Sequence, residues 1–243
     1  MPSDTGQLCG AARLAGPARV EQLHELAVFL LLIVPSMVLS FFAIRTGTLG
    51  FVITAVATIL RDVGLVALVL FFLWRNGESR ERIGWVFRRH WSDVLLGGAL
   101  FVLLSSGISV VDLLLGMLGL TEPSTQLPNF LDPAGDLQLV LAVALVAVVA
   151  VAEETVFRGY LIHRILALTG SRAAAVVLSS LLFALGHGYE GTAGVITVGL
   201  MGLFFALAYL WRGSLVAPIT MHFIQDFASI VLLPLWKTHG GGL

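Results

Sequence analysis

Two adjacent glutamates lie inside an apolar stretch of this chain. Glu153 and Glu154 follow sixteen uncharged residues, Leu137 to Ala152, and Arg158 comes four residues later. A carboxylate in hydrocarbon costs several kcal/mol or more, so ionisable residues within a membrane span usually mark a working site. Two later apolar segments contribute further groups that can transfer protons, namely His187, His222 and Asp226. The pattern predicts an enzyme whose active site lies within the bilayer.

The spacing of the first motif separates the roles of the two glutamates. Glu154 and Arg158 are four residues apart, on one helix face, in the order that favours an ion pair. We therefore expect Arg158 to neutralise and hold Glu154. Glu153 lies about 100° around the helix and lacks that partner. A desolvated carboxylate beside a second one suits a general base that activates water.

The second and third groups should lie at a similar depth. If the chain turns at Thr169–Ser171, Glu154 lies 16 residues before Gly170 and His187 lies 17 after it. Residues equidistant from the turn of an antiparallel pair share one height, so Glu154 and His187 should face each other, roughly 15 Å below the surface. His222 comes out at roughly 12 Å by the same helical rise.

The His222 segment carries two further signals. Asp226 shares a helix face with His222, where its carboxylate can orient the imidazole or help to bind a metal or a water molecule. Pro218 lies one turn before His222 and removes a backbone hydrogen bond, which predicts a local opening of that helix.

The composition indicates a membrane protein. The 243 residues are 58% hydrophobic and only 12% charged, and the mean hydropathy is +0.96. The charged share is about half that of a soluble globular protein. The basic residues form no nucleic-acid patch, and the single cysteine, Cys9, excludes an intramolecular disulfide and a cysteine-rich metal site.

The expected fold is an all-α polytopic transmembrane helical bundle. We predict a disordered tail over 1–22, one transmembrane domain over 23–236 with its catalytic core over 137–236, and a C-terminal tail over 237–243. The apolar runs predict about seven spans. Arg61 and Asp62 interrupt the second run, so a re-entrant piece followed by a helix is the alternative there. The spans are 26–44, 50–74, 93–119, 137–160, 173–188, 193–211 and 214–236.

The charges of the loops predict the orientation. Five arginines lie between Trp74 and Trp91, whereas the loop from Thr121 to Asp136 has no Lys or Arg. By the positive-inside rule, the first of these loops is cytoplasmic and the second is not. Arg164, Arg172 and Arg212 then also fall on the cytoplasmic side.

Three ordered motifs carry a resemblance to a known family. Glu153-Glu154-Thr-Val-Phe-Arg158, then Phe183-Ala-Leu-Gly-His187, then His222-Phe-Ile-Gln-Asp226 resemble the signature of the CPBP family. These are the CAAX-prenyl protease and bacteriocin-processing intramembrane endopeptidases, also called Abi proteins. The stretch Trp74-Arg75-Asn76-Gly77-Glu78 is similar to the bacterial branch, which implies a multi-pass protein of the bacterial inner membrane.

The resemblance implies hydrolysis of a peptide bond by water, without an acyl-enzyme, in a membrane-associated peptide or protein. Glu153 would be the general base, and His187 and His222 would hold the water or a metal ion. Many members have Asn where this chain has Asp226. The resemblance implies that the residue at this position helps to stabilise the oxyanion of the tetrahedral intermediate. Because an ionised carboxylate cannot donate a hydrogen bond to an oxyanion, this role does not carry over to an ionised Asp226.

The cofactor follows from the same resemblance. Family members are often described as metalloproteases, and a Glu/His/His/Asp set suits zinc. The implied ligands are Glu153, His187, His222 and Asp226. A metal-free glutamate–histidine mechanism has also been argued for the family and stays open.

Other interpretations are weighed beside these. Arg61, Asp62 and Asp112 are interpreted as pairing or interfacial groups, and Phe183 as a packing residue that can also shape the substrate groove. A proton-coupled transporter is one alternative function, although no internal repeat supports it. A catalytically silent relative that acts as a membrane immunity or scaffold factor is another. Substrate identity, prenylation and oligomeric state stay open.

Overall fold

The structure is a computed structural model that describes residues 18–46, 50–87, 90–120 and 131–239. It is 88% helical and has no strand among the described residues, which confirms the all-α prediction. Most of the predicted tail over 1–22 and of the loop from Thr121 to Asp136 lies outside the described residues.

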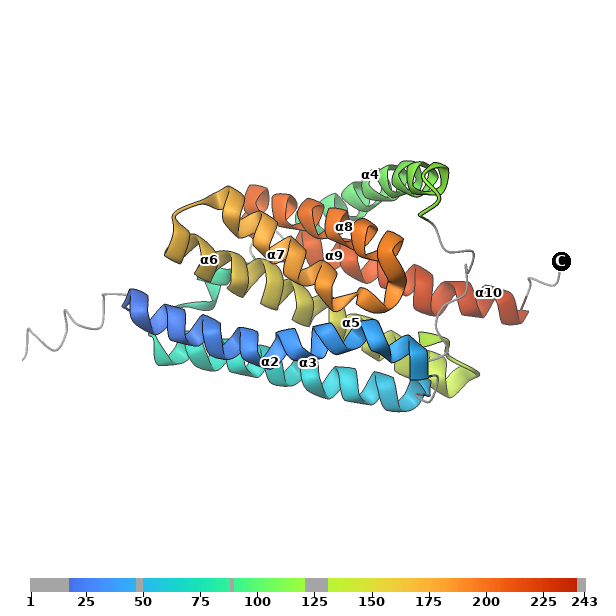
Figure 1. The fold of residues 1–243 in the computed structure, drawn as a ribbon, viewed down its shortest axis with the longest axis horizontal. Coiled ribbons are helices and arrows are strands. Elements are labelled where there is room, and N and C mark those ends of the chain that lie inside the picture. The colour runs from blue at the N-terminus through green and yellow to red at the C-terminus, as the bar shows by residue number, and fades with distance from the viewer. Residues whose placement is uncertain (1–17, 47–49, 88–89, 121–130, 240–243) are drawn as a thin grey trace, which may run out of the picture.

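The helices follow the predicted spans closely. Six of them are long and apolar enough to cross a membrane, by length and composition, and α7 is a shorter apolar helix of 15 residues. The protein is therefore a multi-pass helical bundle, in which most of the long helices run lengthwise through the molecule while α4 crosses them obliquely (Figure 1). The elements are α2 (Arg19–Thr46), α3 (Phe51–Arg75), η1 (Arg80–Ile83), α4 (His90–Met117), α5 (Asp136–Glu153), η3 (Glu154–Leu161), α6 (Ile162–Thr169), α7 (Arg172–Gly186), η4 (Gly188–Glu190), α8 (Gly191–Arg212), α9 (Val216–Asp226), η5 (Phe227–Leu232) and α10 (Leu233–His239).

Two details differ from the sequence-based expectations. Helix α3 runs without interruption through Arg61 and Asp62, so the re-entrant alternative for the second span is wrong. Helix α2 begins at Arg19, so it includes the last residues of the predicted 1–22 tail. The turn between α6 and α7, at Gly170 and Ser171, lies where it was predicted.

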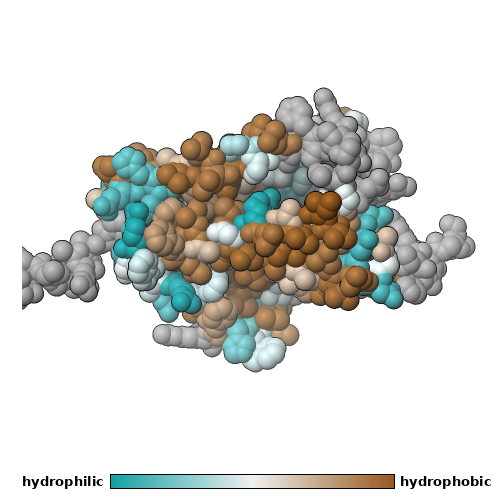
Figure 2. All heavy atoms as spheres, turned by 90° about the horizontal axis from the view of Figure 1, so that it is seen from below, coloured by the Kyte–Doolittle hydropathy of each residue, from teal (hydrophilic) through white to brown (hydrophobic). Residues whose placement is uncertain are grey.

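Apolar side chains cover the outside of the bundle. Leu95 and Leu137 are 77% and 84% exposed, which suits lipid rather than water. Figure 2 shows one face on which apolar residues cover much of the middle, with hydrophilic residues at both ends and smaller hydrophilic patches between them. The broad apolar surface is the one expected of a bundle that spans a bilayer along the direction of most of its helices.

The most buried segment is η3, the π-helical turn that continues α5. All eight of its residues are buried, Glu154 and Arg158 among them. The segment contacts α5, α6, α7, α8 and α3, as well as η1. π-Helical turns are rare and often occur at functional sites. The predicted catalytic motif thus lies at the centre of the bundle.

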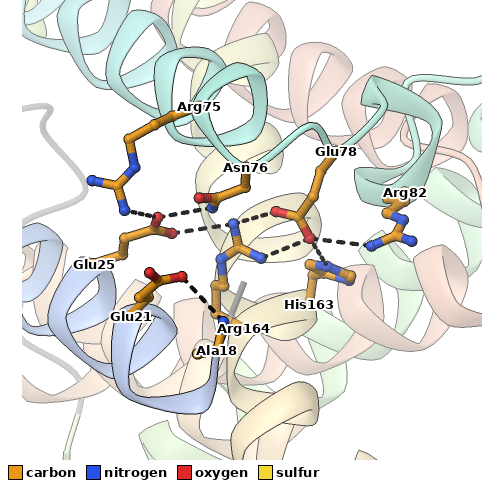
Figure 3. Close-up of polar contacts among 9 residues, drawn as sticks. All are labelled: Ala18, Glu21, Glu25, Arg75, Asn76, Glu78, Arg82, His163 and Arg164. Atoms are coloured by element: carbon orange, nitrogen blue, oxygen red, sulfur yellow. Dashed lines mark hydrogen bonds and ion pairs between the residues drawn. The ribbon is translucent and has the colours of Figure 1, made fainter. Parts of the chain in front are cut away.

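A polar cluster ties four segments together at one end of the bundle (Figure 3). Arg164, fully buried on α6, donates to both carboxylate oxygens of Glu78 and lies 3.2 Å from Oε2 of Glu25 on α2. Burial alone would raise the pKa of Glu78, but hydrogen bonds from His163 and Arg164 hold it at about 2. The cluster consists of Glu25, Arg75, Asn76, Glu78, Arg82, His163 and Arg164.

The polar cluster bears on the predicted topology. It brings Arg75 and Arg82, from the arginine-rich loop, to the same end of the bundle as Arg164. Arg19 at the start of α2 donates to the carbonyl of Leu168 at that end, at 2.6 Å. These basic residues therefore share one side, as the positive-inside reasoning requires, and the cytoplasmic assignment of that side stays a prediction.

Candidate active site

Glu154 is the fixed centre of the site. Its Oε1 accepts from Arg158 at 2.8 Å and from Nδ1 of His222 at 2.9 Å. The side chains of Glu154 and Arg158 are 0% and 1% exposed. The predicted ion pair is present, and it also anchors His222 from a different helix. A buried pair of this kind is costly to break from one side, because an uncompensated charge remains.

Arg158 makes further contacts on α8 and α7 in this arrangement. Its second terminal nitrogen donates to the carbonyl of Gly202 on α8 at 3.3 Å, and its guanidinium lies 4.1 Å from the ring centre of Phe183. A Cβ added at Gly202 would come within 3.3 Å of that guanidinium and 3.0 Å of Phe183. The absence of a side chain at 202 lets α8 approach Arg158 closely.

His222 has a carboxylate at each ring nitrogen. Besides Glu154 at Nδ1, it has Asp226 at 3.3 Å and Glu153 at 3.9 Å from Nε2. An imidazole that donates from both nitrogens carries two ring protons and hence a positive charge. The geometry supports the predicted role of Asp226 in orienting His222. The hydrogen bond between His222 and Glu154 also joins α9 to η3 across the bundle.

Glu153 differs from Glu154 in its surroundings. Its side chain is 17% exposed, and that of Asp226 is 23% exposed, whereas Glu154 is closed off. The Oε2 atom of Glu153 is itself buried and, like Oε2 of Glu154, has no hydrogen-bond partner within the part of the chain that the structure describes. What distinguishes Glu153 is its partly exposed side chain beside an anchored His222, which suits a general base.

His187 reaches the site through Phe183 rather than by a direct contact. Its Nδ1 lies 3.0 Å from the carbonyl of Phe183, and its ring centre lies 4.8 Å from the Phe183 ring. The other side of Phe183 faces His222, at 5.9 Å between ring centres. Since a carbonyl only accepts, Nδ1 of His187 donates, and Nε2 of the neutral ring is left as an acceptor.

The prediction that Glu154 and His187 lie equally far from the α6–α7 turn can be compared with the observed bounds of the helices. Helix α7 ends at Gly186, so His187 is its C-terminal cap, 15 helical residues from Arg172. Glu154 begins η3, 15 residues before Thr169. Both therefore lie roughly 22 Å from the α6–α7 turn, so the equal spacing from the turn holds, and the depth of roughly 15 Å below the membrane surface stays a prediction.

The structure corrects the expectation for Pro218. Helix α9 begins at Val216, so Pro218 falls in its first turn, where the missing N–H breaks no helical hydrogen bond. The local irregularity lies after Asp226 instead, in the π-helical segment η5. A π-helical turn thus follows both Glu153 and Asp226.

Sequence reasoning missed two groups beside the site. On α3, Asp62 is 2% exposed and its charge interacts with those of Glu153 and His222. In the turn after α7, Glu190 interacts with His187, Asp226 and Glu153. The signals were present: an Arg-Asp pair inside an apolar run, and a Tyr-Glu pair directly after the histidine motif.

The predicted zinc ligands do not form a metal site in this arrangement. No group of three or more His, Cys, Asp or Glu side chains is placed to hold a metal ion in the described ranges. Of the four implied ligands, His222 lies 3.3 Å from Asp226 and 3.9 Å from Glu153 through Nε2, whereas His187 reaches the site through Phe183. The donor types suit zinc but their placement does not fit it, and zinc binding stays a prediction from the sequence.

Comparison with known families identifies the segment that carries the site. Residues 135–228 match the family model described as "Type II CAAX prenyl endopeptidase Rce1-like". This stretch covers under half of the chain and includes every predicted site residue, from Glu153 to Asp226. No curated protein and no solved structure matches the chain. This match supports the resemblance to the CAAX protease family that the three motifs carry.

Proposed function

We propose that this protein is an intramembrane endopeptidase that hydrolyses a peptide bond in a membrane-associated peptide or protein. Glu153 acts as the general base and His222, held by Glu154 and Asp226, is the adjacent cation. The Rce1-like match supports the reaction class, because it describes an endopeptidase. The observation that carries the residue roles is the contrast between the closed, paired Glu154 and the partly exposed Glu153.

The proposed reaction begins with a water molecule bound between Glu153 and Nε2 of His187. Glu153 accepts one proton of this water as its oxygen adds to the scissile carbonyl carbon. The tetrahedral oxyanion then collapses, the C–N bond breaks, and the leaving nitrogen takes the proton from Glu153. The positive charge of His222 beside Glu153 favours the anionic states on this path. No step is routed through a metal ion.

The substrate class follows from the same considerations. The site lies among apolar spans, so a peptide reaching it is itself embedded in or attached to the membrane. A C-terminal prenylated peptide of the CAAX type is the first substrate to test, since the family description names it. We place the protein in the bacterial inner membrane, with the polar cluster on the cytoplasmic side, and nucleic acid is not among its partners.

The test compares wild type with Glu153→Ala in two assays. In the first, quenched fluorogenic peptides with and without a C-terminal prenylcysteine are incubated with the purified protein in detergent micelles. In the second, new peptide termini are counted in the membrane proteome of expressing cells. Cleavage that disappears in Glu153→Ala at normal expression supports the proposal.

The same variant separates the alternative functions. Cleavage that persists in Glu153→Ala contradicts the general-base role. A biological effect that persists without any cleavage identifies a scaffold or immunity factor. Ion flux in proteoliposomes that Glu153→Gln abolishes identifies a transporter.

A further inference from the structure

One requirement of peptide hydrolysis is not met by the motif residues alone. The tetrahedral intermediate carries an oxyanion, and stabilising it needs hydrogen-bond donors that point to the reacting oxygen. Asp226 is a carboxylate, so it accepts rather than donates when ionised. The Nε2 atom of His222 already faces Asp226 and Glu153, at 3.3 and 3.9 Å. His187 presents an acceptor nitrogen in the neutral form described above.

Two arginines have charges that interact with Glu153. They are Arg158 and Arg61. Arg158 is 1% exposed and engaged with Glu154 and the Gly202 carbonyl, so it cannot reach a substrate. The side chain of Arg61 is 49% exposed and lies near the middle of α3. Arg61 is thus a cation that a substrate can contact.

The Arg61 guanidinium is held in place rather than loose. Its Nε and one terminal nitrogen both lie 2.8 Å from Oδ1 of Asp62. This leaves the other terminal nitrogen, Nη1, for another acceptor. Asp62 is 2% exposed, and helix α3 packs along α5 and contacts η3, which carry the two glutamates. Ionisable groups inside an apolar span are energetically costly, so such a pair usually marks a functional site.

The charges around Arg61 favour a position beside the reacting bond. Arg61 interacts with Glu153 and also with Tyr189, which lies 5.8 Å from His187 between ring centres. The guanidinium therefore lies within electrostatic range of Glu153, on a helix that packs along α5 and contacts η3. An arginine fork held on one edge by a carboxylate offers its other edge to an anionic oxygen.

We propose that Arg61, positioned by Asp62, donates to the oxyanion that forms when water adds to the scissile carbonyl. This inference rests on the proposed endopeptidase function and assigns to the site a fourth helix, which none of the three motifs includes. In this reaction Arg61 keeps its proton throughout and only its hydrogen bonds strengthen as the carbonyl oxygen gains charge. Asp62 acts through Arg61 and is a positioning residue.

The test uses steady-state cleavage of a prenylated quenched peptide by the purified full chain. Arg61→Gln should lower kcat by about 10²- to 10³-fold with KM changed little, as for loss of one oxyanion donor. Arg61→Lys should fall between Arg61→Gln and wild type, because it keeps the charge but not the fork. Asp62→Asn should lower kcat, and the double variant should be no slower than Arg61→Gln alone.

Arg75→Gln is the matched control. Arg75 lies on the same helix, its side chain is 47% exposed, and it pairs with Glu25 at 2.7 Å, much as Arg61 pairs with Asp62. It lies roughly 21 Å farther along α3, at 1.5 Å per residue, so kcat should stay near that of wild type. A purely structural role for such a pair would lower both variants alike.

Each outcome decides between the proposals. If Glu153→Gln is inactive and Arg61→Gln keeps its kcat within threefold of wild type, this inference fails and the proposed function stands. If Arg61→Gln raises KM and leaves kcat unchanged, Arg61 binds a ground-state carboxylate and the oxyanion role is wrong. If Glu153→Gln cleaves normally, both proposals fail. Partial recovery of Arg61→Ala by added methylguanidinium would support the role independently of how well Arg61→Gln folds.

Discussion

Replacing each of the two adjacent glutamates by glutamine should separate folding from catalysis. Glu154 holds Arg158 at 2.8 Å and His222 at 2.9 Å with one oxygen, and its side chain is 0% exposed. Glu154→Gln removes the charge that compensates a fully buried guanidinium. Breaking a buried pair from one side costs about 3–5 kcal/mol. We expect that loss of folding free energy, together with loss of activity, because His222 also loses its anchor.

Glu153→Gln should behave in the opposite way. The side chain is 17% exposed, and the distance to the nearest nitrogen of His222 is 3.9 Å. A partly exposed pair at that distance contributes about 1 kcal/mol or less to folding. Removing a general base lowers kcat by about 10²- to 10⁴-fold. The expected enzyme is folded, stable and inactive.

The assay pairs two measurements on each purified variant. Unfolding in mixed micelles of denaturing and non-denaturing detergent gives the change in folding free energy, and peptide cleavage gives kcat. The reasoning is refuted if Glu154→Gln is as stable as wild type, or if Glu153→Gln loses as much stability as Glu154→Gln. Cleavage retained by Glu153→Gln refutes the assignment of the base.

Further predictions concern pH, packing and metal. The pKa of Glu78 is lowered from 4.5 to about 2, so its contribution of roughly 3 kcal/mol is complete above pH 4.5 and is lost as the pH falls towards 2. Thermal unfolding between pH 7 and pH 3 should show this loss of stability at low pH, and the loss should be smaller in Glu78→Gln. If Glu78→Gln has the same pH profile as wild type, the stabilising role of Glu78 in the polar cluster is wrong. Gly202→Ala places a Cβ 3.0 Å from Phe183 and should cost about 1–3 kcal/mol by overpacking, whereas Gly98→Ala, inside α4 with nothing within 4 Å, should not lower the unfolding temperature, because Ala favours a helix over Gly. Cleavage should persist after treatment with 1,10-phenanthroline, because the described residues include no group of three or more His, Cys, Asp or Glu side chains placed to hold a metal ion; loss of activity with zinc found by elemental analysis would instead support the metalloprotease prediction.

Some of the site followed from local sequence patterns. The ion pair between Glu154 and Arg158 depends only on a spacing of four residues within one helical segment, and it is present in the structure. The contact of Asp226 with His222 depends on the same spacing and is also present. Interactions within one helix turn are set by the rise and pitch of the backbone, which the sequence pattern already implies.

Other parts depended on contacts between helices. Phe183 was interpreted mainly as packing, yet its ring lies between Arg158, His187 and His222. Arg61 was interpreted as a pairing residue, yet its charge interacts with that of Glu153 on another segment. Which side of a helix meets which neighbour depends on how each helix is rotated about its axis, and spacing along the chain does not give that rotation.

By itself, the sequence determined that this chain spans a membrane and that acids and imidazoles lie on three of its helices, because hydropathy and helical period are properties of short segments. Only the tertiary structure decided that Glu154 is fully buried and anchors His222 on another helix, while the Glu153 side chain stays partly exposed. The same holds for the approach of α3 with Arg61 and Asp62. The physical reason is that contacts between helices set their separation, as at Gly202, where a Cβ would lie 3.3 Å from the Arg158 guanidinium, and spacing along the chain does not encode such contacts.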